Sequence, residues 1–253
     1  MQAYLERAKL PISDYINDTK SAIDQVPRLI AAMHYIAVQD ETIAGNFDLV
    51  CQFSRLRQIM STRTVVDDDP LRLLPGFSPD LLRRLKTNAQ SQKMERPTAW
   101  SLRFAPRNET TSLLKRLLKG RSADVDRMVN SIASLPFYSI EETNVSHEVD
   151  KSTGKSIGKL RISLVIEAGR RGNKGGSSDF SMVLVLGTPQ RKTLLAHRAI
   201  GIRNGSCKRE VELQFDWTAA NAGGGEGGGC IILRLLLEEY RGLDGEITIP
   251  LRR

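Results

Sequence analysis

A Gly-Lys-Ser triplet is the residue pattern in this chain that most resembles a catalytic or nucleotide-binding motif. Gly154-Lys155-Ser156 matches the end of a phosphate-binding loop, in which a lysine and backbone amides hold nucleotide phosphates. The first glycine of such a loop would fall at Val149, and the segment after the triplet alternates like a strand instead of starting a helix. The triplet therefore predicts a hairpin turn, and no nucleotide site is expected.

The histidines and cysteines lack the spacing of a metal site. Zinc sites use closely spaced pairs of thiolates or imidazoles, whereas His34, His147 and His197 are far apart and no Cys-x-x-Cys pair occurs. Three cysteines, an odd number, do not suggest a disulfide framework and favour a reducing compartment. The aspartates at 67–69 are interpreted as a helix cap. We therefore expect no metal, no other cofactor and no enzymatic activity in this chain.

Composition restricts the setting in which the chain works. Its 253 residues carry a net charge of +8, which favours acidic partners such as RNA or a ribosome surface. No run of about 18 apolar residues is present, and the first residues lack a signal-peptide pattern. We expect a cytoplasmic or nuclear protein that makes no contact with a membrane.

The chain divides into three regions by periodicity. Residues 1–66 repeat apolar side chains at helical spacing and predict two helices of a partial α-helical bundle. Residues 67–135 predict a helix-loop-helix unit with a polar loop at 87–111. Residues 136–253 alternate with a period of two, which is typical of strands. The predicted fold class is therefore α+β.

Seven strands are predicted in the third region. Their ranges are 137–149, 159–168, 180–187, 193–202, 208–217, 230–238 and 246–251. Seven short strands at this spacing are typical of an immunoglobulin-like or fibronectin-like β-sandwich. In the last turn, Gly242 and Gly245 supply backbone freedom and Asp244 can bond a nearby amide. Tyr240 is predicted to bury its ring there and to bond its hydroxyl to the backbone.

The first long helix, predicted from 14 to 38, has two different sides. Polar side chains repeat every three to four residues on one side: Asn17, Ser21, Asp24, Gln25 and Arg28. An apolar stripe is expected on the opposite, buried side: Ile16, Ile23, Val26, Leu29, Ile30, Met33, Ile36 and Ala37. Pro27 removes an interior helical hydrogen bond, which predicts a kink near Ile23.

Three segments together resemble a known family. They are the stretch from Leu10 to Met33, the stretch Asp69-Pro70-Leu71-Arg72-Leu73-Leu74-Pro75-Gly76, and the last turn with Tyr240, Gly242 and Asp244. These segments are similar to the Sec-sixty-three homology domain, which ends each helicase cassette of large Ski-two-like RNA helicases. The opening segment is closest to the C-terminal module of the helicase subunit of the activating signal cointegrator complex.

The resemblance implies a non-catalytic C-terminal module that acts as a protein-docking scaffold in ribosome quality control or nucleic-acid repair. The implied partners are helicase motor domains in cis or in trans, and cointegrator-complex or spliceosomal proteins. In similar helicases, the matching helix runs along a single strand and a side chain at the position of Arg28 stacks on a base. The resemblance therefore makes four residues candidates for contact with single-stranded RNA or DNA, or with a ribosome: Asn17, Ser21, Gln25 and Arg28.

Other functions stay open at this point. One alternative is the C-terminal module of the spliceosomal helicase that unwinds small nuclear RNAs. A second is an endoplasmic-reticulum translocation factor, whose family attaches the same module to membrane spans and an acidic tail. A third is a free-standing adaptor. Because Met1 falls partway into the helical bundle of the family, we expect either a fragment or a reduced protein.

Overall fold

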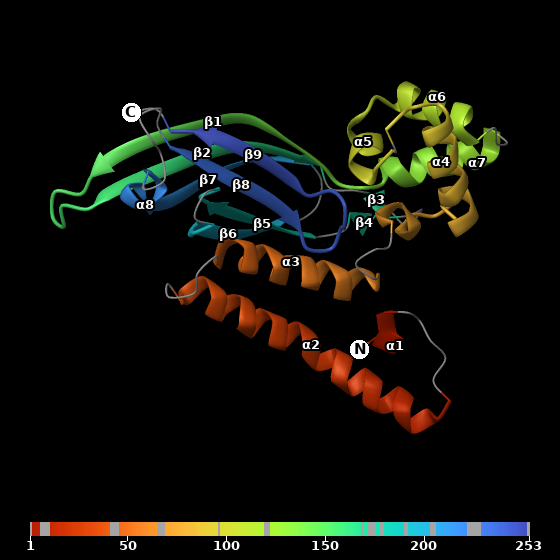
Figure 1. The fold of residues 1–253 in the computed structure, drawn as a ribbon, viewed down its shortest axis with the longest axis horizontal. Coiled ribbons are helices and arrows are strands. Elements are labelled where there is room, and N and C mark those ends of the chain that lie inside the picture. Colours follow the sequence, from red (N-terminus) through yellow and green to blue (C-terminus); the bar gives the residue numbers. More distant parts are fainter. Residues whose placement is uncertain are drawn as a thin grey trace.

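The fold consists of two antiparallel sheets, a layer of two long helices against one of them, and a cluster of shorter helices at one end (Figure 1). The computed structural model describes residues 2–5, 11–40, 46–64, 69–95, 97–118, 122–167, 170–171, 176–177, 180–189, 192–202, 206–221 and 229–251. The prediction of a mixed helix-and-strand fold is confirmed. Among the described residues, no helix combines the length and apolar character needed to cross a membrane.

All seven predicted strands are present, in two sheets. One sheet has the order β1-β2-β7, with β1 Phe137–Val149, β2 Ser156–Glu167 and β7 Ser206–Asp216. The other has the order β6-β5-β8-β9, with β6 Leu194–Ile202, β5 Phe180–Gly187, β8 Cys230–Leu237 and β9 Gly245–Pro250. A short pair, β3 Arg170–Arg171 and β4 Gly176–Ser177, accompanies them. Trp217, expected to end a strand, instead begins helix α8 (Trp217–Asn221).

The two sheets share one apolar core. Alternate residues of β2 are fully buried on the side that faces the other sheet: Leu160, Ile162, Leu164 and Ile166. Strand β5 is apolar on both faces, because Met182 and Leu184 join this core while Val183 and Val185 pack against a helix. That second contact explains why β5 reads as a continuous apolar run in the sequence.

The long helices form a layer along the four-stranded sheet. They are α2 (Ser13–Gln39) and α3 (Asn46–Thr62), with a short α1 (Gln2–Leu5) near the end of α3 (Figure 1). Helix α2 runs without interruption through Pro27. Helix α3 lies between α2 and the sheet, and the ring of Phe47 occupies the space that a side chain at Gly187 of β5 would need. A glycine on the strand thus sets how closely α3 approaches.

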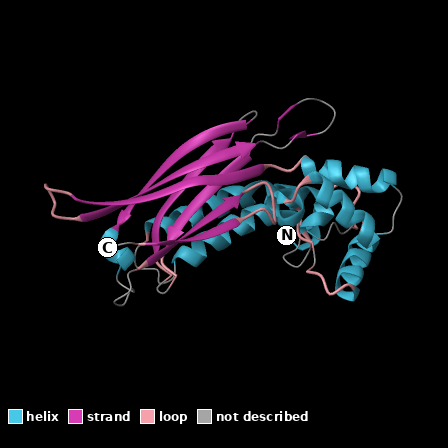
Figure 2. Cartoon of the chain, turned by 90° about the horizontal axis from the view of Figure 1, so that it is seen from above, coloured by secondary structure: helices cyan, strands magenta, loops and turns pink. Residues whose placement is uncertain are grey.

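The helical cluster corrects the expectation of a loop at 87–111. Its elements are η1 (Pro70–Leu73), α4 (Pro79–Ser91), α5 (Ala99–Phe104), α6 (Arg107–Leu118) and α7 (Ser122–Ala133). Thr98 and Ser101 form a capping box that starts α5 inside the supposed loop. Asp69 accepts a hydrogen bond from the Leu71 amide and caps η1 as expected, whereas residues 65–68 lie outside the described part. Figure 2 shows this cluster beside the crossing strands.

Candidate docking interface

Helix α2 presents two different surfaces to solvent. The first is the polar side that the sequence predicts: Asn17, Ser21, Asp24, Gln25 and Arg28 are all exposed. Helical spacing brings these side chains to one side of α2, opposite the residues that it buries. Their role in strand binding stays a prediction, since the geometry supplies exposure and alignment but no bound strand.

The second surface of α2 is apolar and was not expected to be exposed. Only the Val26, Ile30, His34 and Ala37 side of the helix is buried. Leu29 is 60% exposed, Met33 49% and Ile36 56%, although all three belong to the stripe that we expected to pack inward. Tyr15 and Ile16, near the start of α2, are also more than half exposed, at 52% and 53%. The apolar stripe is therefore wider than the surface that α3 covers.

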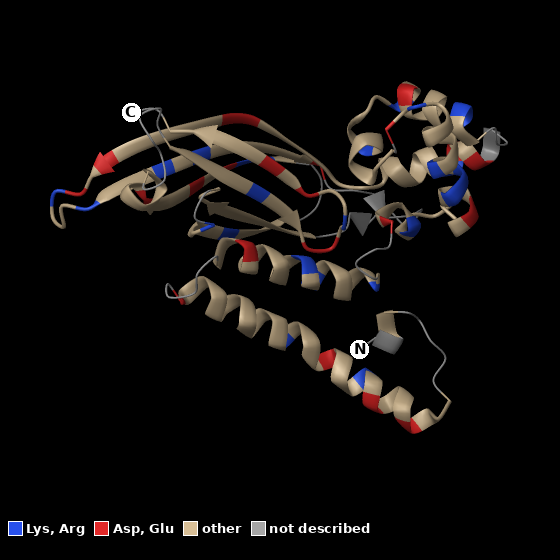
Figure 3. Ribbon diagram, viewed as in Figure 1, with Lys and Arg blue, Asp and Glu red and all other residues tan. Residues whose placement is uncertain are grey.

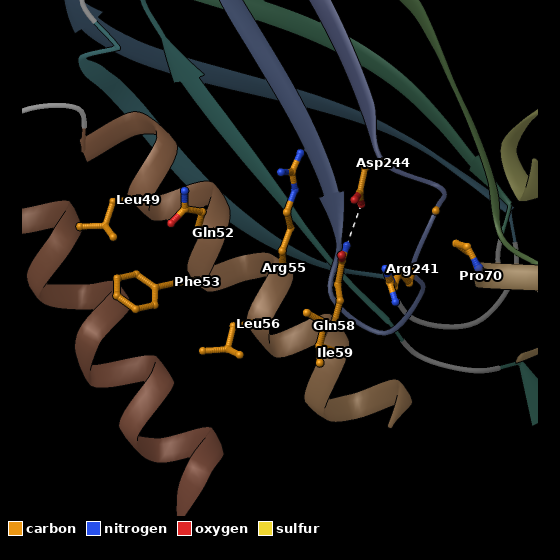
Figure 4. Close-up of a pocket in the computed structure, with 11 residues that line it drawn as sticks. Leu49, Gln52, Phe53, Arg55, Leu56, Gln58, Ile59, Pro70, Arg241 and Asp244 are labelled. Carbon is orange, nitrogen blue, oxygen red and sulfur yellow. Dashed lines mark hydrogen bonds between the residues drawn. The ribbon is translucent and has the colours of Figure 1, made fainter. Parts of the chain in front are cut away.

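Helix α3 is joined to the last turn of the chain by buried polar contacts. The side-chain amide of Gln58 donates to the Leu237 carbonyl at 2.8 Å and to the Asp244 carboxylate at 2.7 Å (Figure 4). Asp244 also accepts from the Leu237 amide at 3.2 Å, which closes the turn in the way the sequence suggests. Arg57, the residue before Gln58 on α3, forms an ion pair of 2.5 Å with Glu238. These contacts fix the last turn to the helical layer.

A buried tyrosine anchors the same turn. Tyr138 of β1 is 3% exposed and donates from its hydroxyl to the Leu243 carbonyl at 2.9 Å. The hydroxyl lies so close to Gly245 that a Cβ there would collide with it. Gly242 has a φ of +81° and faces Pro70, so both features disfavour a side chain at that position. Tyr240 is half-buried, with its ring edge-to-face against Phe180.

A cavity of about 650 Å³ opens between α3 and this turn. Its apolar wall comes from α3 and includes Leu49, Phe53 and Leu56, while Arg55, Arg241 and Asp244 add charge (Figure 4). Phe53 and Leu56 also pack against the Val26 and Ile30 side of α2. The cavity therefore begins beside the contact between the two long helices and ends at the last turn.

Burial shifts the pKa values of three titratable groups at this interface. It raises the pKa of Asp244, against an opposing hydrogen bond from Gln58, and it raises the pKa of Glu238 despite Arg57. Burial also lowers the pKa of His34 to about 4, with smaller contributions from His197 and Arg57. The rings of His34 and His197 meet edge-to-face at 5.3 Å, so a neutral histidine lies where α2 meets β6.

The described residues offer no metal centre. No group of three or more histidine, cysteine, aspartate or glutamate side chains within them could hold an ion. The cysteines that the structure places are not disulfide-bonded, and Cys51 is buried with its pKa raised by that burial.

Two important residues were missed in the sequence. Gln58 was overlooked because it lies within an apolar repeat, and a polar side chain at a core-facing position of α3 was the available signal. Tyr138 begins a strand far from the last turn in the chain, so nothing local connects it to Leu243. The predicted residues form two separate groups: the polar side of α2 faces solvent, and Tyr240, Gly242 and Asp244 lie across α3 at the turn.

Comparison with known proteins identifies similar segments in very long chains. The RQC trigger complex helicase SLH1 of Saccharomyces cerevisiae is 39% identical over 93 residues, which are 37% of this chain and 4% of that protein. Activating signal cointegrator 1 complex subunit 3 of Dictyostelium discoideum is 34% identical over 88 residues, or 35% of this chain and 4% of that protein. The matched segment is thus a small fraction of either relative.

Solved structures add no argument about the fold. The exo-chitosanase CsxA of Amycolatopsis orientalis has a TM-score of 0.27 and 9% identity, over 46% of this chain and 13% of the enzyme.

The family comparison covers almost the whole chain, because the Sec63 Brl domain matches residues 1–250. The sequence resemblance is therefore confirmed, and the relatives place the domain in a helicase-associated module. The chain belongs to the Sec63 Brl domain family.

Proposed function

We propose that this chain is a non-catalytic protein-docking module of a large helicase, in a role like that of the cointegrator-complex helicases in ribosome quality control or nucleic-acid repair. Its three proposed units are residues 1–66, 67–135 and 136–253, the last an immunoglobulin-like sandwich. Seven strands in two antiparallel sheets support the sandwich assignment. Similarity to a helicase named for the RQC trigger complex supports the pathway.

The exposed apolar stripe of α2 is the observation that carries this proposal. Contiguous exposed apolar residues on a folded protein usually mark a contact surface. Leu29, Met33 and Ile36 lie at helical spacing, so a partner could cover all three at once. The proposed partners are helicase motor domains, in cis or in trans, together with proteins of the same complex.

The test is direct binding between this chain and the purified motor domains of an SLH1-type helicase. We expect the double variant Leu29→Asp/Met33→Asp to weaken binding by at least tenfold, because it places two charges in an apolar contact, and a central apolar contact is often worth about 2 kcal/mol. Both positions are solvent-exposed, so the fold should be retained.

A matched control separates this surface from a general effect of charge. Tyr35 is 66% exposed on α2, away from the stripe, and Tyr35→Asp should leave binding unchanged. Equal loss of binding in the control and the double variant, or full binding in both, would rule out the stripe as the docking surface.

Contact with single-stranded nucleic acid is the second candidate function. Its support is the exposed polar side of α2, where Arg28 follows Asn17, Ser21 and Gln25. A guanidinium can stack on a base or grip a phosphate, and the net charge of +8 favours such ligands. Another alternative is that the chain is the C-terminal module of a spliceosomal-type helicase and uses the same surface there.

A further inference from the structure

The cavity between α3 and the last turn has an apolar end and a basic end. Leu49, Phe53 and Leu56 form the apolar end, and their spacing of four and three residues places them on one side of α3. All three are only half-buried, although Phe53 and Leu56 also pack against α2. The volume of about 650 Å³ lies within the usual range for sites that enclose a ligand. The apolar end can therefore take in a large side chain from another molecule.

Two arginines and one aspartate give the other end its charge. Arg55 of α3 and Arg241 of the last turn line it together with Asp244 (Figure 4). Two guanidinium groups against one carboxylate leave a net positive charge beside the apolar wall. Figure 3 shows the same contrast along α3, whose middle is basic while much of the helix around it is uncharged.

Arg55 is the charged group of the cavity that the fold leaves to solvent. Asp244 is bonded within the fold, because the Gln58 amide donates to it at 2.7 Å. Arg55 acts on Asp244 through charge, but it is exposed and forms no hydrogen bond or ion pair within the described part of the chain. Arg57, by contrast, pairs with Glu238 at 2.5 Å. An exposed guanidinium beside an apolar cavity favours a ligand that brings a carboxylate.

We propose that this cavity binds a short segment of a partner protein in which a large apolar side chain stands next to an acidic residue. The apolar side chain enters between Leu49, Phe53 and Leu56, and the carboxylate meets Arg55 at the basic end. The proposal rests on the protein-docking function proposed above, but it uses a surface other than the exposed stripe of α2.

The dimensions of the cavity fit an extended segment. Its α3 wall runs from Leu49 to Ile59, ten residues of helix or about 15 Å. An extended chain covers this length with about five residues. Pro70 and Gly242 border the cavity from outside α3, so the segment lies between the helix and the last turn. A probe with an acidic residue on each side of the apolar one can meet Arg55 in either chain direction.

The experiment titrates a short glycine-serine peptide, with one phenylalanine between two glutamates, into the full chain and follows it by two-dimensional NMR. We expect the largest amide shifts along the cavity, at Gln52, Arg55 and Gly242. A peptide with glutamines in place of the glutamates should bind about fivefold more weakly, the usual upper limit for a partly exposed ion pair. A peptide with serine in place of phenylalanine should not bind detectably, because it leaves the apolar end empty.

Two pairs of matched variants locate the site. Arg55→Glu should weaken binding of the glutamate peptide at least tenfold, because it replaces attraction with repulsion. Arg84→Glu makes the same charge change on α4 and should leave the affinity unchanged. Gln52→Trp places a bulky side chain at the cavity and should block binding, whereas Gln90→Trp on α4 should not. All four positions are exposed, so the fold should be retained.

Binding of the motor domains separates this proposal from the docking function itself. Leu29→Asp/Met33→Asp lies outside the cavity and should leave peptide binding unchanged. Motor-domain binding that depends on these two residues, with no peptide bound at the cavity, would overturn the cavity proposal alone. Equal affinity of the glutamate and glutamine peptides, or equal effects of Arg55→Glu and Arg84→Glu, would overturn it as well.

Two further results would assign the cavity to a different occupant and so contradict the proposal. Shifts at the same residues when the chain alone is concentrated would indicate a second copy of this chain. Displacement of the peptide by single-stranded RNA, at an RNA concentration below that of the peptide, would indicate that Arg55 and Arg241 bind phosphate.

Discussion

Tyr138 ties the last turn of the chain to β1 through one buried hydrogen bond. Its hydroxyl donates to the Leu243 carbonyl, and both residues are almost fully buried. Burial raises the pKa of Tyr138, so the hydroxyl stays protonated and remains a donor. Tyr138→Phe should lower the free energy of unfolding by about 1 to 2 kcal/mol, because it leaves a buried carbonyl without its partner.

Urea unfolding measures this loss. Tyr35→Phe, which removes an exposed hydroxyl from α2, should leave the midpoint unchanged. An equal midpoint for Tyr138→Phe and the native chain would show that water or another donor replaces the hydroxyl.

His34 makes the contact of α2 with β6 sensitive to acid. Its pKa falls from 6.5 to about 4 on folding, so the folded state binds fewer protons than the unfolded state between these values. Stability from this group is therefore complete above about pH 6.5 and decreases as pH falls towards 4. Protonation of His34 in the unfolded state should therefore lower the free energy of unfolding by about 2 kcal/mol at pH 5 relative to pH 7.

The test is to measure the free energy of unfolding at pH 5 and at pH 7, in the native chain and in the variant His34→Gln. Glutamine does not titrate, so the variant should lose much less stability on acidification. His197, whose pKa burial also lowers, and the nearby Arg57 remain in both proteins and serve as the internal background. A pH dependence that is identical in the two proteins would assign the acid response to other groups.

At the scale of elements, the approach of α3 to β5 depends on one glycine. The ring of Phe47 occupies the space beside Gly187, whereas a Cβ at Gly201 of the neighbouring β6 would meet nothing within 4 Å. Gly187→Ala should therefore force α3 away from the sheet and cost about 1 to 3 kcal/mol, the usual penalty of overpacking.

Gly201→Ala is the matched control, because it makes the same chemical change in an adjacent strand of the same sheet. It should leave stability the same or slightly higher. Thermal unfolding of the two variants compares them, and equal midpoints would mean that Phe47 can turn aside at little cost.

The strands could be predicted from sequence because alternation is a local signal that follows directly from the pleat. The loop expected at 87–111 was wrong because its helices are short and polar, and α5 buries only Ala99 and Leu102. The prediction that Leu29, Met33 and Ile36 pack inward was also wrong. Periodicity shows which side of a helix is apolar, but it does not show how much of that side a neighbouring element covers. Contacts such as Gln58 with Asp244 join residues far apart in sequence, so no local pattern contains them.

At the scale of the whole molecule, the surfaces differ in the ligands that they suit. The stripe on α2 is apolar, whereas the short helices carry exposed cations such as Arg84 and Lys86. A nucleic acid could therefore bind through diffuse charge on the short helices as well as through α2. Affinity alone cannot distinguish the two modes, because both weaken as salt rises.

The distinction requires two arginine variants of equal charge change. Arg28→Ala removes the side chain proposed to stack on a base, and Arg84→Ala removes an exposed arginine from α4. If α2 guides a strand, Arg28→Ala should weaken binding of single-stranded RNA by about 1 to 3 kcal/mol, the usual worth of stacking one base. Arg84→Ala should weaken RNA binding less, because it removes only a diffuse charge.

Binding of a labelled single-stranded RNA, measured by fluorescence anisotropy at several salt concentrations, separates these contributions. Both variants should reduce the salt dependence by a similar amount, because each removes one cation that can contact a phosphate. The loss that persists at high salt should belong to Arg28→Ala alone, since stacking is not screened. Equal losses at every salt concentration would leave the polar side of α2 as an ordinary solvated surface and favour protein docking as the function of this helix.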